Sequence, residues 1–516
     1  MRAAAALTLV LCAEWSCAFH APVSHRVPVV ARAKAELRLA PIHMEADAPA
    51  SPSPMVASAV LGVGTACLGT AYAKALKRSV SLVWTRLPSM LPLADPTLFI
   101  PMACTIGGLV VGLAALKLPP SATMVDVIRE QNSADSSLPG IRPLPSVLIL
   151  SLLTSTFGFS VGPEAPMVVA GALSGAAFSK RVYGDDNHAM ARTMAYAGAA
   201  GALTTFISMP LAGALFVLEI TRASSGLSAG AYDALTPAVV ASCTSMMTAK
   251  ALFAPAASIG GHFVYDAVGH ALTGKAMAAI ALSAGVAGAV VARTFLFLVT
   301  LLKKPMFPAA PADETCEVDK RWACGPKTRG VLVKVAVGLC VGLISLFFPQ
   351  TLFWGEGSLQ HVLDGQRTAL SAVWPGLSTA LTARAVADVS LPLAGASAAL
   401  KVGLAKLLAI SLACAGGFPG GIIFPLFFAA SALAHSCAAL LPPALLPVWV
   451  MSLMASTQAS VTRTPLATVF MLGLSAAASA HLSVLLPPVI MAAYIGVWAS
   501  RLIGKATFFP YPSNAD

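Results

Sequence analysis

Apolar stretches close to the length of a membrane-spanning helix recur along most of this chain. Examples are residues 97–116, 190–218, 276–302, 330–348 and 466–500. A helix that crosses a bilayer needs roughly 20 consecutive, mainly apolar residues. The pattern therefore predicts an all-α polytopic membrane protein.

Glycine and proline interrupt these apolar stretches instead of gathering in polar linkers. The chain has 40 glycines and 37 prolines, and many of them lie inside apolar segments. Broken helices are tolerated within a membrane where they line a protein-enclosed cavity. The pattern is typical of a transporter or channel built from many short, tilted and broken helices.

Two short motifs occur in the same order in both halves of the chain. Residues 162–166 (GPEAP) correspond to residues 421–425 (GIIFP), and the leading glycines are 259 positions apart. Residues 209–216 (MPLAGALF) correspond to residues 464–471 (TPLATVFM), and the prolines are 255 positions apart. Because both pairs keep nearly the same spacing, we predict two related halves.

Each repeated motif has the chemistry of a helix start. Glycine lets the backbone approach a ligand closely, and proline fits the first helical turn, where its missing N–H is no loss. The unpaired N–H groups and the positive end of the helix dipole then favour an anion. In duplicated transporters such half-helices meet near the bilayer midplane. We therefore expect a small-anion site between the two motifs, one that needs no Lys or Arg.

Composition and charge agree with the membrane class. Hydrophobic residues make up 57% of the 516 positions and charged residues only 11%, against about one-quarter charged residues in a soluble domain. The net charge of +11 is spread over short loops, as the positive-inside bias produces. Basic residues do not cluster with aromatic residues, so we expect membrane lipid around the protein and no nucleic acid as a partner.

The ten cysteines form no C-x-x-C pair, and metal-ligand spacing is absent from the sequence. Cys316 and Cys324 share one polar loop, where a disulfide and two free thiols are both open alternatives. We therefore expect neither a metal nor a cofactor.

Several motifs together resemble the CLC family of chloride channels and transporters. Besides GPEAP at 162–166 they are AGAAG at 197–201, PLAGALFVLE at 210–219, GGFPGGIIFP at 416–425 and the FP…WGEG segment at 348–357. The likeness covers about residues 55–510. It implies the inverted-repeat CLC fold and a homodimer in which each subunit has one pathway for chloride.

The resemblance implies that Glu164 occupies the position of the family's external gating glutamate. A carboxylate on the first turn of a helix can occupy the anion site itself as a tethered competitor, and its protonation or outward movement opens the path. An ionisable group inside a membrane is costly and is therefore a functional candidate. The alternative is that Glu164 only caps its helix.

Carried over position by position, the resemblance also assigns the backbone of the site. The N–H groups of Ile422 and Ile423 face the anion, and this chain has Ile423 where the family often has phenylalanine. The expected anion-binding residues are Ser121, Gly162, Pro163, Gly421, Ile422, Ile423, Phe424 and Phe508.

Two of these assignments rest on segments that depart from the family pattern. Ser121 matches the anion-binding serine of the family's G-S-G-I-P motif, which reads PSATM here, and Thr123 is its rival. Phe508 matches the inner tyrosine of the pore, with Tyr511 as a weaker substitute. Phenylalanine narrows a pore but donates no hydrogen bond.

Glu219 and Ile220 bear on the transport mechanism. Family exchangers carry an internal glutamate that relays protons; Glu219 matches the acid just before that position, and Ile220 occupies the position itself. Isoleucine holds no proton, so we expect a passive chloride channel or an uncoupled carrier. A proton-coupled antiporter with a different relay is the main alternative, and a fluoride-selective variant is a further one. For Glu219 we expect a structural acid satisfied by local backbone or water.

Residues 158–162 (GFSVG) also fit G-x-S-x-G, the nucleophile motif of serine hydrolases. That motif needs a strand before the serine, whereas Ser160 follows an apolar stretch, 144–157, without a β-branched run. His188 and His262 are the histidines nearest in sequence and lie in no partner motif. We therefore expect that the protein is not an enzyme, and an intramembrane serine hydrolase is the remote alternative.

The N-terminal region has the pattern of a targeting leader. Residues 1–18 form a signal peptide with a small-residue cleavage site, and residues 19–54 form a basic presequence and linker. Together they resemble the bipartite plastid leaders of algae, which predicts a plastid membrane. The alternative is a plain secretory signal with a disordered tail, and a membrane of the secretory pathway or vacuole.

The membrane domain is expected at residues 55–510. Its halves are placed at about 55–256 and 271–510, and a short tail follows at 511–516. The chain stops soon after its last apolar run, so we expect no CBS domains within it.

Overall fold

The computed structural model describes residues 52–90, 96–132, 140–221, 229–253, 272–307, 327–363, 395–476, 482–504 and 506–509. Within these ranges the chain is nearly all helical, and its one pairing of strand type is a single β-bridge. Several features of the sequence analysis lie outside the described residues. They are the predicted leader up to residue 51, the tail at 511–516 with Tyr511, His262 and the two loop cysteines.

The helices divide between the two halves of the chain. Those of the first half are α2 (Pro54–Ser81), α3 (Leu87–Met90), α4 (Pro96–Lys117), α5 (Met124–Asn132), α6 (Leu144–Thr156), α7 (Glu164–Tyr183), α8 (His188–Ile207), α9 (Pro210–Ile220) and α10 (Ala229–Phe253). Those of the second half are α11 (Gly274–Met306), α13 (Lys327–Phe347), α14 (Glu356–Leu363), α17 (Ala396–Ala415), α18 (Ile423–His435), α19 (Leu446–Thr462), α20 (Pro465–Ala476) and α21 (Leu482–Ile503).

Seven of the described helices are long and apolar enough to cross a membrane. Three predicted stretches coincide with one helix each, namely 97–116 with α4, 276–302 with α11 and 330–348 with α13. The prediction of an all-α polytopic membrane protein is thereby confirmed.

Two other apolar stretches are each divided into two helices. The run 190–218 covers α8 and α9, and the run 466–500 covers α20 and α21. In the first run, Ser208 takes a left-handed conformation with φ of 59° and Pro210 begins the next helix. This break agrees with the helix start predicted at the 209–216 motif, whereas hydropathy alone does not register a break of two residues.

Four apolar helices are too short to cross a bilayer. They have 13, 11, 13 and 12 residues and are α6, α9, α18 and α20. At 1.5 Å per residue the longest reaches roughly 20 Å, against a hydrocarbon core about 30 Å thick. These helices must therefore begin or end inside the protein, as the glycine and proline pattern predicted.

The repeat is visible in the backbone as well as in the sequence. The helices α8 and α19 both end in a left-handed residue, Ser208 with φ of 59° and Arg463 with φ of 55°, two positions before the proline that starts the next helix. Further upstream, Gly158 with φ of 81° and Gly417 with φ of 72° precede the two motifs at equal distance. The two halves thus turn their chains in the same way at corresponding positions.

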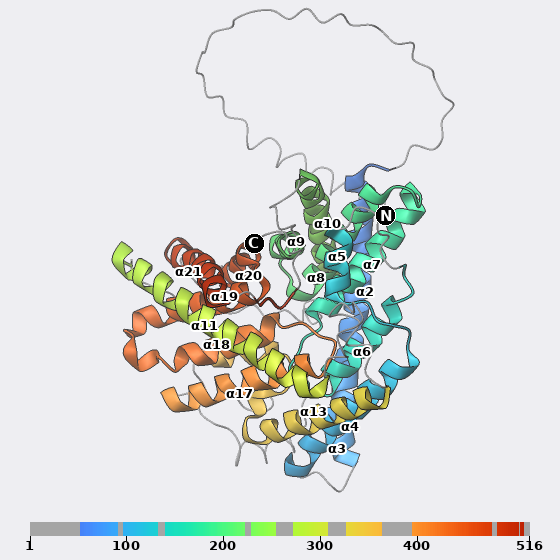
Figure 1. The fold of residues 1–516 in the computed structure, drawn as a ribbon. Coiled ribbons are helices and arrows are strands. Elements are labelled where there is room, and N and C mark those ends of the chain that lie inside the picture. The colour runs from blue at the N-terminus through green and yellow to red at the C-terminus, as the bar shows by residue number, and fades with distance from the viewer. Residues whose placement is uncertain are drawn as a thin grey trace, which may run out of the picture. The chain divides into compact units, whose positions relative to one another are not determined.

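Corresponding helices also pack in corresponding pairs. In the first half α2, α8 and α10 contact one another, and in the second half α11, α19 and α21 do the same. Figure 1 shows the first half, coloured blue to green, beside the second half, coloured yellow-green to red. The helices α4 and α13 pack together across the boundary, as do α9 and α20.

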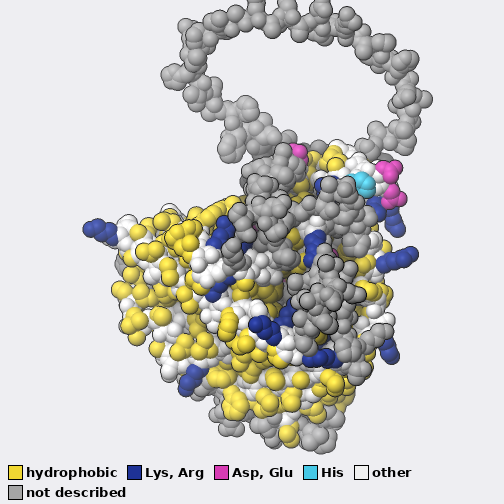
Figure 2. Space-filling view, viewed as in Figure 1, with side chains coloured by type: hydrophobic (Ala, Val, Ile, Leu, Met, Phe, Trp, Pro, Cys, Tyr) yellow, Lys and Arg dark blue, Asp and Glu magenta, His cyan; other side chains and the backbone are white. Residues whose placement is uncertain are grey.

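Apolar side chains cover much of the described surface (Figure 2). On α11 the exposed ones recur every four or seven residues, at Leu282, Val286, Val290, Phe297 and Leu301. Such a stripe faces lipid or another protein in a membrane helix.

Helices α7 and α8 pack closely because glycines meet at their interface. A Cβ atom at Gly171 would collide with the carbonyl oxygen of Gly198, and one at Gly198 would collide with that of Gly171. Small residues permit this close backbone approach between membrane helices.

We expect Gly171→Ala to destabilise the protein, because the new methyl group forces α7 and α8 apart. Overpacking of this kind costs about 1–3 kcal/mol, which thermal unfolding in detergent can measure. Gly64→Ala on α2 is the matched control, since a Cβ there meets no atom within 4 Å and alanine is the better helix former. Equal unfolding midpoints for the two variants would contradict the expected packing role.

Candidate functional site

Two helix starts from opposite halves are joined by a backbone bridge. The N–H of Gly162 donates to the carbonyl oxygen of Gly421 at 2.8 Å, and the N–H of Gly421 donates back to the oxygen of Gly162. Beside the bridge, the rings of Phe159 and Phe418 stack with their centroids 3.9 Å apart. The helices that follow are α7 and α18, which carry the repeated motif.

Glu164 is the first residue of α7, and its side chain is fully buried. Its Oε1 accepts a hydrogen bond at 3.4 Å from the backbone N–H of Phe424, in the first turn of α18. Its Oε2 has no hydrogen-bond partner among the described residues. The carboxyl group therefore lies at the start of the half-helix from the other repeat, where negative charge is favoured.

Glycine at positions 162 and 421 makes room for this carboxyl group. A Cβ atom at either position would collide with Oε2 of Glu164. The bridge thus brings two backbone segments and one carboxylate into close contact. Any other residue type at position 162 or 421 would force the carboxylate or a backbone segment to shift.

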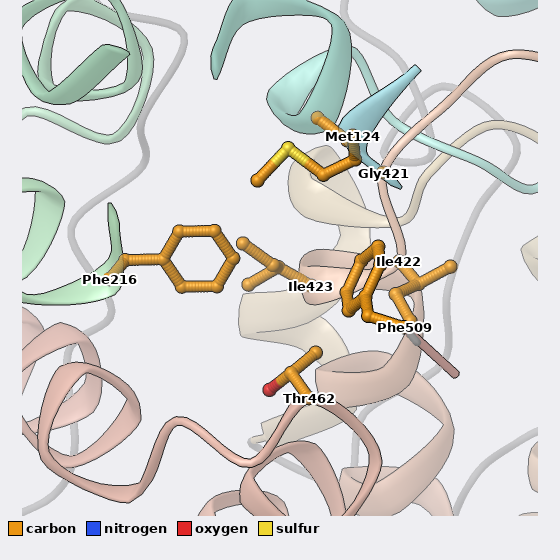
Figure 3. A pocket seen from close by; sticks show the side chains of 8 residues that line it. Met124, Phe216, Gly421, Ile422, Ile423, Thr462 and Phe509 are labelled. Carbon is orange, nitrogen blue, oxygen red and sulfur yellow. The ribbon is translucent and has the colours of Figure 1, made fainter. Parts of the chain in front are cut away.

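A small cavity lies next to this point (Figure 3). Its volume is about 10 Å³, close to the least that holds one water molecule. Figure 3 shows side chains from several helices converging on it, and its lining residues are Met124, Ala165, Phe216, Gly421, Ile422, Ile423, Thr462 and Phe509.

Three helices begin at the cavity. Met124 is the first residue of α5, Ala165 is the second of α7, and Ile423 is the first of α18. The positive ends of these three helix dipoles therefore lie beside one small space between largely apolar side chains. This arrangement suits a small anion with little or no water around it.

The structure brings most of the predicted anion-binding residues together. Gly421, Ile422 and Ile423 line the cavity, and Gly162 is bonded to Gly421. Pro163 is the N-cap residue of α7, and Phe424 donates its N–H to Glu164.

Ser121 and Thr123 are not among the residues that line the cavity. Ser121 Oγ donates to the carbonyl oxygen of Ala122 at 3.3 Å, and Thr123 accepts from and donates to Asp126 as the cap of α5. Met124 lines the cavity instead. The signal for this register was the Thr123-x-x-Asp126 pair, which has the form of a capping box.

Phe509, and not Phe508, lines the cavity. The ring of Phe508 packs against Phe295 of α11, with centroids 5.7 Å apart. The rings of Phe508 and Phe509 contact each other with centroids 4.9 Å apart, so the sequence assignment is in error by one residue.

Glu219 lies at the end of α9 and is nearly fully buried. Its Oε1 accepts from the N–H of Leu466 at 3.1 Å, and its Oε2 accepts from the N–H of Ala467 at 2.8 Å. Both donors belong to the first turn of α20, so Glu219 caps a helix of the other half. Ile220, at the relay position, is completely buried in the apolar core.

Lys406 is a buried charge that the sequence analysis missed. It lies on α17 with no exposed surface, and its Nζ donates to the carbonyl oxygens of Thr351 at 3.1 Å and Phe353 at 2.7 Å. The ammonium group also lies 5.0 Å from the centre of the Phe428 ring. The signal was a lysine inside an apolar helix, which is costly unless the protein supplies partners.

Ser160 lies in the short segment between α6 and the bridge, and its hydroxyl is buried. The preceding element is the helix α6 and not a strand. His188 begins α8 and is exposed. The described geometry does not assemble the strand, turn and helix that a nucleophile motif requires.

Comparison with known proteins agrees with this architecture. A family model described as "Voltage gated chloride channel" matches residues 107–501. The putative ion-transport protein YfeO of Salmonella newport (strain SL254) is 24% identical over 380 residues, which cover 72% of this chain and 77% of that protein.

Solved structures share the fold at low sequence identity. A slow cyanobacterial Cl⁻/H⁺ antiporter has a TM-score of 0.68 and 17% identity, covering 88% of this chain and 95% of its own. A CLC-type fluoride/proton antiporter has a TM-score of 0.63 and 21% identity, covering 88% and 96% respectively. A eukaryotic CLC transporter has a TM-score of 0.63 and 14% identity, covering 88% and 72%.

We expect Glu219→Ala to destabilise the protein by at least about 1–3 kcal/mol, because two N–H groups of α20 lose their acceptor in a buried place. Glu219→Gln keeps one acceptor oxygen and should therefore lose less stability. Asp185→Ala is the control, since its exposed carboxylate forms a surface ion pair with Lys180 worth roughly 0–1 kcal/mol. Unfolding in detergent measures all three, and equal stabilities would contradict the capping role.

Proposed function

The chain belongs to the voltage gated chloride channel (CLC) family, and we propose that it carries small anions, chloride first among them, through the cavity beside Glu164. In this proposal Glu164 is the gate, and the helix starts of α7 and α18 form the anion site. The family consists of transporters and channels, and we propose no enzymatic reaction.

The observation that carries the proposal is the position of the Glu164 carboxyl group. It is fully buried, it accepts the N–H of Phe424, and it lies against Gly162 and Gly421. A carboxylate in that place makes the interactions that a bound anion would make with the same helix start.

Glu164 can act as a gate because its carboxylate and a mobile anion compete for the same helix start. While Glu164 is charged, its carboxylate satisfies the start of α18 and keeps another anion away by repulsion. Protonation removes the charge and weakens the hydrogen bond from Phe424. The N–H groups of Ile422, Ile423 and Phe424 are then available to an anion, and at low dielectric they hold it without a basic side chain.

Two transport mechanisms remain, and each has an observation in its favour. Ile220 is a buried isoleucine at the relay position, which supports passive conduction of chloride. Proton-coupled antiport is supported by the fold neighbours, of which two are described as Cl⁻/H⁺ and fluoride/proton antiporters. The second of these also supports testing fluoride beside chloride.

We further propose that residues 55–510 form the membrane domain of a homodimer. The apolar surfaces within residues 190–256 and 445–500 are the candidate interfaces, and they include the exposed side chains of Met247, Leu474 and Trp498. The basic leader supports a plastid membrane as its location, with the secretory pathway or vacuole as the alternative.

We expect Glu164→Gln to raise chloride flux at neutral pH several-fold and to abolish its rise on acidification. Glutamine has nearly the shape of glutamate but carries no charge at any pH, so it cannot act as a titratable competitor. The measurement is chloride efflux from proteoliposomes over a series of pH values. Asp185→Asn is the control for loss of one acidic side chain. A pH dependence equal to that of the unsubstituted protein would rule out Glu164 as the gate.

Simultaneous recording of chloride and proton flux from the same proteoliposomes separates the two mechanisms. For a passive channel we expect a chloride gradient to drive chloride without moving protons uphill. A proton flux in fixed ratio to chloride would instead establish antiport. Absence of chloride and fluoride flux alike would overturn the proposed function.

A further inference from the structure

One guanidinium group on α11 holds the chain segment that follows the last helix. The Nε of Arg293 donates to the carbonyl oxygen of Ser500 at 2.6 Å, and its Nη1 donates to that of Ala506 at 2.7 Å. Its Nη2 donates to the carbonyl oxygens of Ser500 and Gly504. Arg293 lies more than 200 positions before these acceptors, so the contact joins two distant parts of the chain.

The acceptors explain why an arginine is suited to this place. The helix α21 ends at Ile503, and the carbonyl groups of its last turn lack partners inside the helix; that of Ser500 also accepts the N–H of Gly504 at 3.2 Å. A guanidinium presents five N–H donors in a rigid plane, and its charge favours the negative end of a helix dipole. One side chain therefore satisfies the end of α21 and also directs the chain that leaves it.

The segment held in this way leads directly to the cavity. Phe509 is three residues beyond Ala506 and lines the cavity with Ile422 and Thr462 (Figure 3). The helix α11 makes a second contact with this segment, because the ring of Phe295 packs on that of Phe508. Thr507 Oγ1 donates to the carbonyl oxygen of Phe509 at 2.7 Å and fixes the local turn.

We propose that Arg293 is a positioning residue that holds the Phe509 ring at the cavity and thereby sets the size of anion that passes. This inference rests on the proposed function. Phe509 follows α21 in a segment without helical structure, so the ring has no helix of its own to fix it. Its position depends on the contacts that α11 makes through Arg293 and Phe295.

The test compares the flux of a large anion with that of a small one. Iodide and chloride efflux are measured from proteoliposomes that contain Arg293→Gln, Phe509→Ala or both changes. We expect each single change to raise the iodide-to-chloride ratio several-fold, because the ring is displaced in one variant and removed in the other. The iodide-to-chloride ratio of the double variant should be only slightly higher than that of the single variant with the larger effect, since both changes act on one ring.

Further variants separate positioning from general damage. Arg293→Lys should recover the original ratio only in part, because an ammonium group cannot reach three carbonyl groups in a plane. Arg501→Gln removes an exposed charge from the last turn of α21, the helix whose end Arg293 holds, and should leave the ratio unchanged. If Arg293→Gln does not fold, Phe295→Leu removes the packing on Phe508 and should shift the ratio in the same direction.

The outcomes distinguish this inference from the proposed function. If the unsubstituted protein carries no anion, the proposed function fails. If Phe509→Ala raises the ratio while Arg293→Gln and Phe295→Leu do not, anion transport stands and the positioning role of Arg293 is overturned. Additive effects of Arg293→Gln and Phe509→Ala would overturn it as well.

Discussion

A helix that begins or ends inside a bilayer leaves backbone N–H or C=O groups that water does not reach, and each group needs a partner from the protein. The short helices α6, α9, α18 and α20 create such ends in this structure. Two buried acids described above, Glu164 and Glu219, are partners of such ends. The candidate site is one of these ends, and its chemistry follows from how the end is satisfied.

Four charged side chains form hydrogen bonds with backbone groups at helix ends or in turns. Glu164 accepts from the start of α18 and Glu219 from the start of α20, so acids of the first half complete helices of the second. Lys406 holds the carbonyl groups of Thr351 and Phe353, and the N–H of Phe353 in turn donates to the carbonyl oxygen of Gly158 at 2.9 Å. Arg293 holds the end of α21. Each of these four charges is thus paired with backbone groups, and for the three buried ones this pairing offsets the cost of burial.

The sequence was sufficient for the fold class, the repeat and the helix starts, because glycine and proline restrict the backbone wherever they stand. It was insufficient where neighbouring residues of similar character compete for one position. Phe508 and Phe509 are consecutive residues in a bend, and only tertiary contacts such as that with Phe295 decide which ring lines the cavity. The same holds for the start of α5, where the cap at Thr123 directs Met124 inward. Lys406 was missed because an apolar helix gives no local sign of which carbonyl groups will surround its lysine.

The two acids at helix starts differ in one respect that bears on their roles. Both oxygens of Glu219 accept hydrogen bonds from consecutive N–H groups of α20, which is the arrangement of a permanent cap. Glu164 has one longer hydrogen bond, from Phe424 at 3.4 Å, and its second oxygen lies without a partner among the described residues. Moving the Glu219 carboxylate would break two hydrogen bonds of normal length in an apolar environment. Moving the Glu164 carboxylate would break one long hydrogen bond, and its other oxygen has no partner among the described residues to lose. An incompletely satisfied carboxylate beside a cavity is the one that a mobile anion can replace, and for this reason the geometry favours Glu164 as the gate and Glu219 as part of the frame.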